Sequence, residues 1–388
     1  MKSEPRSISV RALQLFVLLL ASSLLLPAYA ALPIPEAPQL SASSYILEDY
    51  QTGTILAEKN ADEKVAPASI TKLMTLYVVF HALKSGAINP DDMVTISEKA
   101  WRMGGSRMFI EVGNKVSVEN LIEGVVVASG NDAAVALAEF VGGTEGGFVN
   151  MMNTYAQRLG MTNSHFTDAS GLPHPNHYMT ARDIATLARA IIRDFPKYYH
   201  QYFADKEFTW NNIHQTNRNL LLWRDPSVDG LKTGHTNEAG YCLVTSAKRG
   251  NMRLIAVVMG TDSEEARANQ NEALLNYGYH FFEGRTLYAA GSKLTEAKVW
   301  KGSADMVPIG VKSDLYVVVP KGRAGKLDAS MKLPATIVAP VDTDQPIGKV
   351  QVTMGGEPVA SAPLYALDPV AKGGLWTRMM DSVVLMFH

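Results

Sequence analysis

The sequence has very little cysteine and no strongly basic stretch, and both shortages limit what the protein can be. Its 388 residues include one cysteine, so no disulfide can form within the chain. The 36 basic and 38 acidic residues leave a formal net charge of -2, without a basic run that could follow a nucleic-acid backbone. Motifs for phosphate and dinucleotide binding are also missing. We therefore expect no nucleic-acid partner and no cofactor, and a fold stabilised by core packing.

The cysteine and histidine residues do not form a recognisable metal site. Cys242 lies in the apolar run 240–244 without a histidine or second cysteine at ligand spacing, so we expect a small core residue rather than a nucleophile. His174 and His177 lie among prolines, with no third ligand nearby. A proline-rich loop is the better interpretation of that segment, and no metal is expected.

The N-terminus has the three parts of a secretory signal. Lys2, Arg6 and Arg11 precede the apolar run 13–26, and Ala28-Tyr29-Ala30 supplies small residues for cleavage. A retained membrane anchor is the weaker alternative, because the apolar run is shorter than the ~20 residues of a spanning helix. We predict export and cleavage after Ala30.

Changes in composition divide the rest of the chain, which is long enough for two domains. A proline-rich lead follows the signal, and short β-rich runs with glycine and proline begin beyond Gly284. We predict a signal sequence over residues 1–30, a linker over 31–43, a larger domain over 44–284, a small all-β domain over 285–371 and an amphipathic helix over 372–388.

The larger domain mixes strand and helix patterns. Two short strands, 45–47 and 54–56, flank a turn near its start, and two more, 241–246 and 252–259, flank Arg249-Gly250-Asn251 near its end. Helical patterns cover 67–83, 118–128, 131–141, 147–159, 181–192 and 273–282. This arrangement predicts an α+β fold, in which one antiparallel sheet is built from both ends of the domain and covered by a helical lobe.

The terminal segment has an apolar and a polar side when it is drawn as a helix. Leu375, Trp376, Met379, Met380, Val383, Val384, Met386 and Phe387 share about half of the wheel over residues 374–388. This segment is too short to cross a bilayer but suits the surface of a membrane. Packing on its own domain or on a protein partner is the alternative, because only Lys372 and Arg378 supply positive charge.

Ser69 and Lys72 form the strongest catalytic candidate. Three residues apart on a helix, their side chains lie on one face, so the amine can reach the hydroxyl. The helix is almost wholly apolar, and an unpaired lysine in such surroundings is costly. Burial also lowers the pKa of an amine, so that the amine can act as a base. Ser69 is therefore the predicted nucleophile and Lys72 the predicted base.

Two further motifs are weak alone and informative together. Ser129-Gly130-Asn131 interrupts two helical runs, and Lys232-Thr233-Gly234 opens a strand-like region. Ser-x-x-Lys, Ser-x-Asn and Lys-Thr-Gly, in this order, are the motifs of serine β-lactamases and penicillin-binding proteins. Gly130 stands where a typical class A β-lactamase has aspartate.

Over essentially its whole length, the chain resembles the D-alanyl-D-alanine carboxypeptidases, which are low-molecular-mass penicillin-binding proteins. The resemblance rests on the segments Pro67-Ala68-Ser69-Ile70-Thr71-Lys72, Ser129-Gly130-Asn131-Asp132 and 229–236. It implies a β-lactamase/transpeptidase-like domain, an acyl-enzyme on Ser69, peptidoglycan pentapeptides as substrate and β-lactams as covalent inhibitors. It also implies a location at the periplasmic face of the cytoplasmic membrane, held by the terminal helix.

The resemblance implies a role for each site residue. Ser129 relays a proton to the leaving amine, Asn131 binds the peptide amide, Lys232 keeps Lys72 deprotonated, Thr233 binds the terminal carboxylate, Gly234 allows edge-on pairing of the peptide, and the N–H groups of Ser69 and His235 hold the oxyanion. Arg267 is a further carboxylate candidate; the alternative is an exposed arginine beside Glu264 and Glu265. A β-lactamase and a non-catalytic β-lactam or peptidoglycan binder remain alternative functions.

Overall fold

The computed structural model describes residues 34–387, and the predicted signal sequence lies outside that range. Its larger domain is built on a five-stranded sheet in the order β2-β1-β9-β8-β7, in which each neighbouring pair is antiparallel. The strands are β1 (Ser44–Asp49), β2 (Ile55–Lys59), β7 (Val228–Thr236), β8 (Gly240–Arg249) and β9 (Met252–Thr261). Because β1 pairs with β9, both ends of the domain meet in one sheet, as the sequence predicts.

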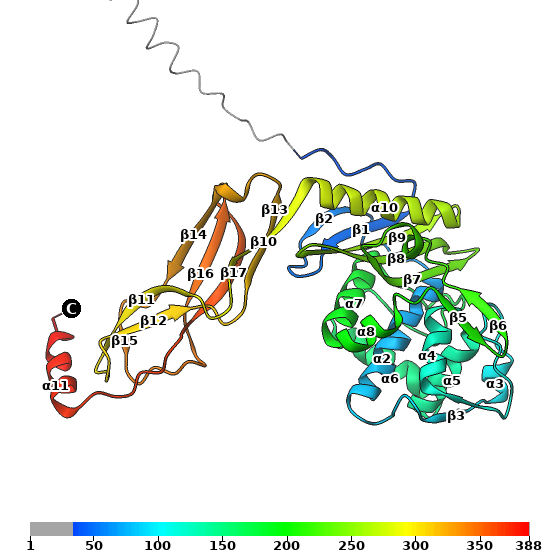
Figure 1. The fold of residues 1–388 in the computed structure, drawn as a ribbon, viewed down its shortest axis with the longest axis horizontal. Helices are drawn as coiled ribbons and strands as arrows, with labels where there is room; N and C mark the ends of the chain where they lie inside the picture. The colour runs from blue at the N-terminus through cyan, green and yellow to red at the C-terminus, as the bar shows by residue number, and fades with distance from the viewer. Residues whose placement is uncertain (1–33, 388) are drawn as a thin grey trace, which may run out of the picture. The chain divides into compact units, whose positions relative to one another are not determined.

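The central strands of this sheet are buried on both faces. Alternate residues of a strand point to opposite faces, and Val257 packs in the core beneath the helical lobe while Val258 packs beneath α10 (Glu264–Phe281). In Figure 1, α10 lies along one face of the sheet, and the labelled helices from α2 to α8 gather on the opposite face. The predicted α+β architecture is confirmed.

The helical lobe surrounds one buried helix, α2 (Lys72–Lys84), which follows a 3-10 turn, η1 (Ala68–Thr71). The lobe also contains α4 (Val118–Val126), α5 (Asn131–Gly142), α6 (Glu145–Arg158), α7 (Ala181–Asp194) and α8 (Pro196–Tyr202). Smaller elements are β3 (Met93–Thr95), α3 (Glu98–Trp101), β4 (Lys115–Ser117), β5 (Glu207–Trp210), β6 (Ile213–Thr216) and α9 (Leu221–Arg224). The single helix expected over 67–83 is therefore a 3-10 turn followed by an α-helix, and Ser69 lies on the turn.

The C-terminal region is an all-β domain with its own core, which includes Val307, Ile309, Val350 and Leu364. β10 (Phe282–Tyr288) pairs with β13 (Leu315–Pro320), and a second sheet has the order β14-β16-β17-β12-β11-β15. Its strands are β11 (Lys293–Trp300), β12 (Met306–Gly310), β14 (Leu327–Lys332), β15 (Ile337–Val338), β16 (Pro346–Met354) and β17 (Glu357–Ala366), with a short 3-10 turn η2 (Ala324–Lys326). The predicted β-rich character is confirmed.

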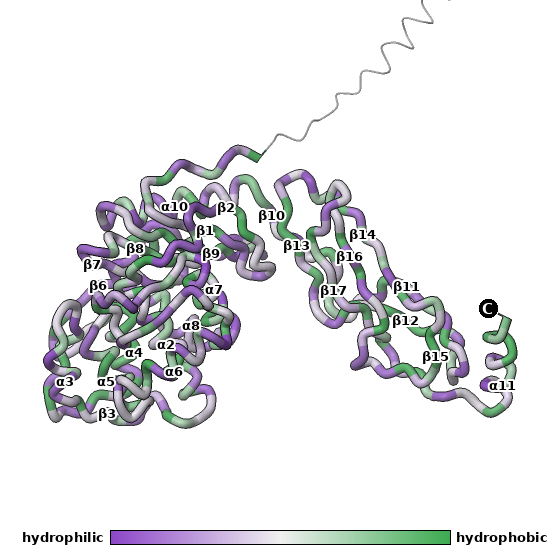
Figure 2. Tube along the Cα trace, turned by 180° about the vertical axis from the view of Figure 1, so that it is seen from behind, coloured by the Kyte–Doolittle hydropathy of each residue, from purple (hydrophilic) through white to green (hydrophobic). Residues whose placement is uncertain are grey.

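The terminal helix α11 spans Leu375–Val384, with Gly374 as its N-cap and Leu385 as its C-cap, and is therefore shorter than the predicted 372–388. Hydrophobic and polar residues are interspersed along it (Figure 2). Trp376 is 72% exposed, whereas Thr377 and Asp381 on its polar side are only partly exposed. Among residues 34–387, no helix has the length and apolar character needed to cross a bilayer.

Candidate active site

Ser69 and Lys72 meet at the start of the buried helix. Residues three apart eclipse one another on a 3-10 turn, and Lys72 Nζ lies 2.9 Å from Ser69 Oγ. Ala68 takes a φ of 49°, an unusual left-handed conformation for alanine, directly before Ser69. The chain therefore turns sharply into the helix at the predicted nucleophile.

Lys72 is fully buried, yet each of its three possible N–H directions has a partner. Besides Ser69, its amine donates to Asn131 Oδ1 at 2.7 Å and to the Ser170 carbonyl at 2.8 Å. Burial lowers the pKa of Lys72 to about 7, with a smaller lowering by Arg218 and opposite effects from Asp168 and Asp132. A neutral amine is therefore available near neutral pH.

Asn131 holds a defined orientation between one acceptor, the Gly104 carbonyl, and one donor, the Lys72 amine. Its Nδ2 donates to the Gly104 carbonyl at 2.7 Å, which leaves Oδ1 facing Lys72. Asn131 opens α5, just after the Ser129-Gly130 turn. The second motif therefore meets the first through a direct contact between an amide and an amine.

Ser129 combines an unusual backbone with an unpaired hydroxyl. Its φ is 56°, and its buried Oγ has no hydrogen-bond partner among residues 34–387. Next to it, a Cβ on Gly130 would lie 2.7 Å from the Asp132 carboxylate, which itself accepts the N–H groups of Met108, Phe109 and Ile110. Glycine at the middle of this motif therefore fits the close packing around Asp132.

The third motif lies on β7, which packs against the turn that carries Ser69. A Cβ on Gly234 would come within 3.0 Å of the Pro67 carbonyl and 3.1 Å of Ile70, so glycine allows this close approach. Close packing against the turn thus explains why glycine occupies position 234. Its pairing with the substrate stays a prediction. Lys232 is buried, and burial, followed by the charge of Lys72, holds its pKa well below the ordinary value.

Two hollows of about 390 and 140 Å³ share Ser69, Ser106, Arg218 and His235 among their lining residues. Asn131, Ser170, Gly171 and Thr236 line the first, and Ser129, Thr233, Gly234 and Arg267 line the second. A larger hollow, around Tyr279, contains none of the motif residues. The three motifs thus converge on one cleft beside the predicted nucleophile.

The cleft is rich in positive charge, part of which sequence reasoning missed. Arg218 Nη1 donates to Ser106 Oγ at 2.7 Å, and neither residue belongs to a recognisable motif. Arg267 is 2% exposed and directs Nη1 to the Gly234 carbonyl at 3.4 Å, so the exposure expected in the alternative is wrong. Its proximity to Glu264 is confirmed, since Nη2 lies 3.4 Å from Glu264 Oε1. With Lys232 these arginines provide a site for an anionic group.

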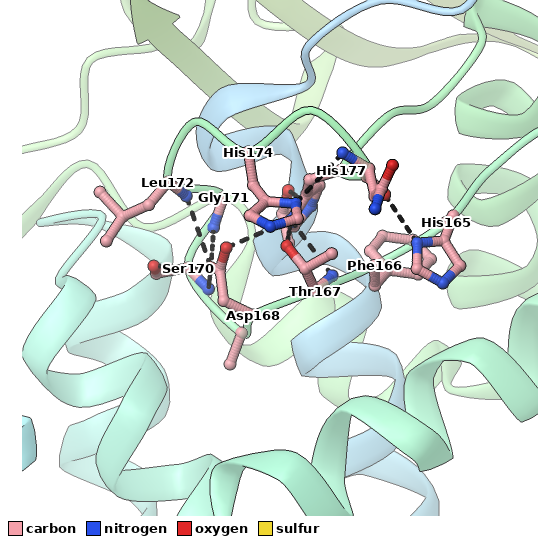
Figure 3. A network of polar contacts seen from close by, with 12 residues as sticks. His165, Phe166, Thr167, Asp168, Ser170, Gly171, Leu172, His174 and His177 are labelled. Atoms are coloured by element: carbon pink, nitrogen blue, oxygen red, sulfur yellow. Dashed lines mark hydrogen bonds and ion pairs between the residues drawn. The ribbon is translucent and has the colours of Figure 1, made fainter.

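A third group that sequence reasoning missed comes from the loop between α6 and α7, whose Ser170 carbonyl contacts Lys72. His177, assigned above to a proline-rich loop, is buried in this loop beside Asp168 (Figure 3).

Cys242 is buried, as predicted, and burial raises the pKa of its thiol to about 11.

The fold combines an antiparallel sheet with a helical lobe, and its cationic cleft holds a serine and lysine pair. Together these features define a serine acyltransferase or hydrolase of the penicillin-recognising class. The family model described as D-alanyl-D-alanine carboxypeptidase matches residues 32–263, and that described as penicillin-binding protein 5, C-terminal domain, matches residues 282–372. The chain belongs to the D-alanyl-D-alanine carboxypeptidase family. It is a serine-type D-Ala-D-Ala carboxypeptidase of cell-wall synthesis.

Two relatives match both domains, and a third matches about two thirds of the chain. The D-alanyl-D-alanine carboxypeptidase DacA of Escherichia coli (strain K12) is 42% identical over 363 residues, which cover 92% of this chain and 90% of that protein. The crystal structure of penicillin-binding protein 5 from Haemophilus influenzae is similar with a TM-score of 0.82 and 43% identity, over 87% of this chain and 100% of that one. Penicillin-binding protein D2 of Listeria monocytogenes, solved in an ampicillin-bound form, is 30% identical with a TM-score of 0.58, over 63% of this chain and 100% of that one.

Proposed function

We propose that this chain removes the terminal D-alanine of peptidoglycan pentapeptides through an ester on Ser69. The observation that carries the proposal is the set of contacts made by Lys72. Asn131 Oδ1 and the Ser170 carbonyl can only accept hydrogen bonds, so they take the two N–H groups of a neutral amine. The remaining lone pair then faces Ser69 Oγ, where it can take the hydroxyl proton.

Acylation follows from this arrangement. Ser69 Oγ attacks the carbonyl carbon of the penultimate D-alanine while Lys72 takes its proton. The oxyanion accepts the N–H groups of Ser69 and His235. The tetrahedral intermediate then breaks its C–N bond, and the proton that Lys72 took from Ser69 passes through the Ser129 hydroxyl to the amine of the leaving D-alanine. The Ser129 hydroxyl has no competing partner in the described residues.

Substrate binding uses the amide and cationic groups of the cleft. Asn131 contacts the peptide amide, and Thr233, assisted by Arg218 and Arg267, binds the terminal carboxylate. Repulsion between two buried ammonium groups is mutual, so protonation of Lys232 opposes protonation of Lys72. Carboxylate recognition accounts for a preference for the free end of a peptide.

Deacylation requires water to attack the ester carbonyl and returns the proton to Ser69. A β-lactam presents a reactive amide in place of the scissile bond, so it acylates Ser69 in the same way and leaves a slowly hydrolysed ester. The ampicillin-bound relative supports this second ligand class. A β-lactamase would instead hydrolyse that ester rapidly.

One pair of assays distinguishes these functions. Diacetyl-Lys-D-Ala-D-Ala is incubated with the purified protein, and free D-alanine is measured beside the turnover of nitrocefin. The carboxypeptidase releases D-alanine and forms a stable penicillin adduct on Ser69. Rapid nitrocefin turnover without D-alanine release identifies a β-lactamase instead, and a penicillin adduct with neither activity identifies a non-catalytic binder.

We further propose that the mature protein stands at the periplasmic face of the cytoplasmic membrane, held there by α11. Leu375, Trp376 and Phe387 are 84%, 72% and 85% exposed, while the polar side of the helix is the better covered one. An apolar surface of this kind at a chain end suits insertion into a lipid headgroup region. Deletion of residues 375–388 should abolish flotation with anionic phospholipid vesicles while D-alanine release persists; undiminished flotation would refute the anchor.

A further inference from the structure

The loop that reaches Lys72 is organised around an acidic and a histidine side chain. Asp168 Oδ1 accepts the N–H groups of Ser170 at 2.7 Å, Gly171 at 2.6 Å and Leu172 at 3.4 Å, and the Ser170 hydroxyl at 2.8 Å. Figure 3 shows these contacts converging on one carboxylate. Because two of these donors flank the Ser170 carbonyl, Asp168 sets the direction of the group that accepts from Lys72.

The other oxygen of Asp168 faces His177. His177 Nδ1 lies 3.2 Å from Asp168 Oδ2, and the imidazole side chain is 1% exposed. A carboxylate only accepts, so this contact requires a proton on Nδ1. The Thr167 N–H lies 3.3 Å from the same nitrogen and Thr167 Oγ1 lies 3.1 Å from it. An N–H donates only to an unprotonated nitrogen, so the hydrogen bonds of Nδ1 with Asp168 and with the Thr167 N–H are alternatives that belong to different tautomers.

The far side of the imidazole reaches the turn that bears the nucleophile. His177 Nε2 lies 2.9 Å from Thr71 Oγ1, the residue directly before Lys72. Thr75 Oγ1, one turn further along α2, donates to the Ala169 carbonyl at 2.6 Å. The loop is therefore tied to the catalytic helix on both sides of the Lys72 contact.

Gly171 allows the backbone of the loop to lie in direct contact with the turn that carries Ser69. A Cβ at this position would lie 1.8 Å from the Ala68 carbonyl and 2.7 Å from Thr71 Oγ1, and Gly171 has a φ of 88°. Only glycine fits such an approach in this conformation. The loop and the turn thus form one packed unit, in which a displaced side chain moves the Ser170 carbonyl.

We propose that Asp168 and His177 are positioning residues, which hold the Ser170 carbonyl on the Lys72 amine and so aim its lone pair at Ser69. The proposal deepens the function above and rests on Lys72 as the base. Neither side chain contacts Ser69 or lines the two hollows at the cleft. Their effect on the reaction passes through Lys72.

Asp168 also acts on Lys72 through its charge. It raises the pKa of Lys72, as does Asp132 on α5, whereas Arg218 lowers it and Lys232 on β7 faces the same amine. Glu145 contacts the loop through the Ala169 N–H at 3.1 Å. Removal of the Asp168 charge should therefore lower the pKa of Lys72 and shift the acidic limb of kcat/KM to lower pH.

The test measures D-alanine release against pH in the full-length protein and its variants. Asp168→Asn keeps an acceptor for the loop N–H groups but loses the charge, whereas Asp168→Ala loses both. His177→Asn and Thr71→Val break the link to the turn, and Thr71→Ser restores its hydroxyl. His174→Asn, an exposed histidine of the same loop, is the matched control. Thermal unfolding of each variant reports the folded fraction.

We expect kcat/KM per folded molecule to fall on the order of 10-fold to 100-fold in Asp168→Ala and His177→Asn, mainly through kcat, because small misplacements of a catalytic group are costly. Thr71→Ser should keep more activity than Thr71→Val. Asp168→Asn should lose less than Asp168→Ala and show the acidic shift. Unchanged kcat/KM and pH profile in Asp168→Asn and His177→Asn, or losses matched entirely by unfolding, would overturn the proposal. Wild-type protein that releases no D-alanine would instead overturn the proposed function.

Discussion

The cleft and the terminal helix depart from the usual rules of burial in opposite directions. In the cleft, Lys72, Lys232 and Arg267 are buried although their side chains are ionisable, whereas large apolar side chains at the chain end, such as Trp376 in α11 and Phe387 just after it, are exposed. Both departures cost stability, and such costs are usually found at functional sites.

The two regions differ in how their costs are offset. Lys72 finds its three partners within the described chain, so the cleft is arranged before any substrate arrives. The apolar side chains of α11 are left exposed by the described residues, and we propose that an external surface covers them. The comparison predicts that cleft variants change chemistry without changing location, and that α11 variants do the reverse.

The largest expected effect is at the nucleophile. Ser69→Ala should reduce D-alanine release by roughly 10³-fold or more, because the acyl-enzyme cannot form. It should leave vesicle binding intact. Mass spectrometry after penicillin treatment should show no adduct, while Ser85→Ala, an exposed serine at the end of α2, should be labelled like the wild type.

A smaller loss is expected at Arg218. Arg218→Ala removes a cationic hydrogen-bond donor for the substrate carboxylate, worth about 1.5–3 kcal/mol, so kcat/KM should fall roughly 10-fold to 100-fold. The loss should shrink for a substrate whose terminal carboxylate is amidated. Arg224→Ala, an exposed arginine near Glu265, is the control; an equal loss there would contradict a specific carboxylate contact.

The pH dependence should report on Lys72. The pKa of this amine is about 7, and only its neutral form accepts the Ser69 proton. As pH falls below about 7, kcat/KM should decrease roughly 10-fold per pH unit, while rates above it level off. Stopped-flow acylation by a chromogenic β-lactam should follow the same limb; an acylation rate independent of pH would exclude Lys72 as the base.

At the terminal helix, a single added charge should act differently on its two sides. Trp376→Asp places a carboxylate on the exposed apolar side and should weaken vesicle binding roughly 10-fold or more, since burial of a large apolar side chain contributes about 1.5–3 kcal/mol. Thr377→Asp adds the same charge to the better covered polar side and should weaken binding less. Equal weakening would show that net charge, rather than the apolar surface, governs binding. D-alanine release should be unchanged in both.

The smallest effect is expected at Cys242. Its thiol is buried with a pKa raised to about 11, so a thiol reagent should label it only after unfolding. Cys242→Ala should retain most D-alanine release. Rapid labelling of the folded protein with loss of activity would contradict a purely packing role.

Sequence reasoning recovered what depends on local pattern. Two strand-like runs on either side of Arg249-Gly250-Asn251 located the pairing of β8 with β9, and the apolar run from Pro67 located the central helix. It missed the 3-10 turn at Ser69 because Ala68 takes a left-handed φ, which an alanine in a sequence does not indicate. It also extended the terminal helix past Val384, since helix ends depend on capping details as well as on periodicity.

Three motifs far apart in the chain were enough to determine the class of chemistry, because the chemical groups of serine, lysine and asparagine are known from the residue type alone. Only the tertiary structure decided how Lys72 becomes a base. Its partner Ser170 lies 98 positions away and contributes a backbone carbonyl, which any residue could supply. Asp168, His177 and Gly171 matter through loop geometry and close approach, and such contacts leave no period or spacing in a sequence.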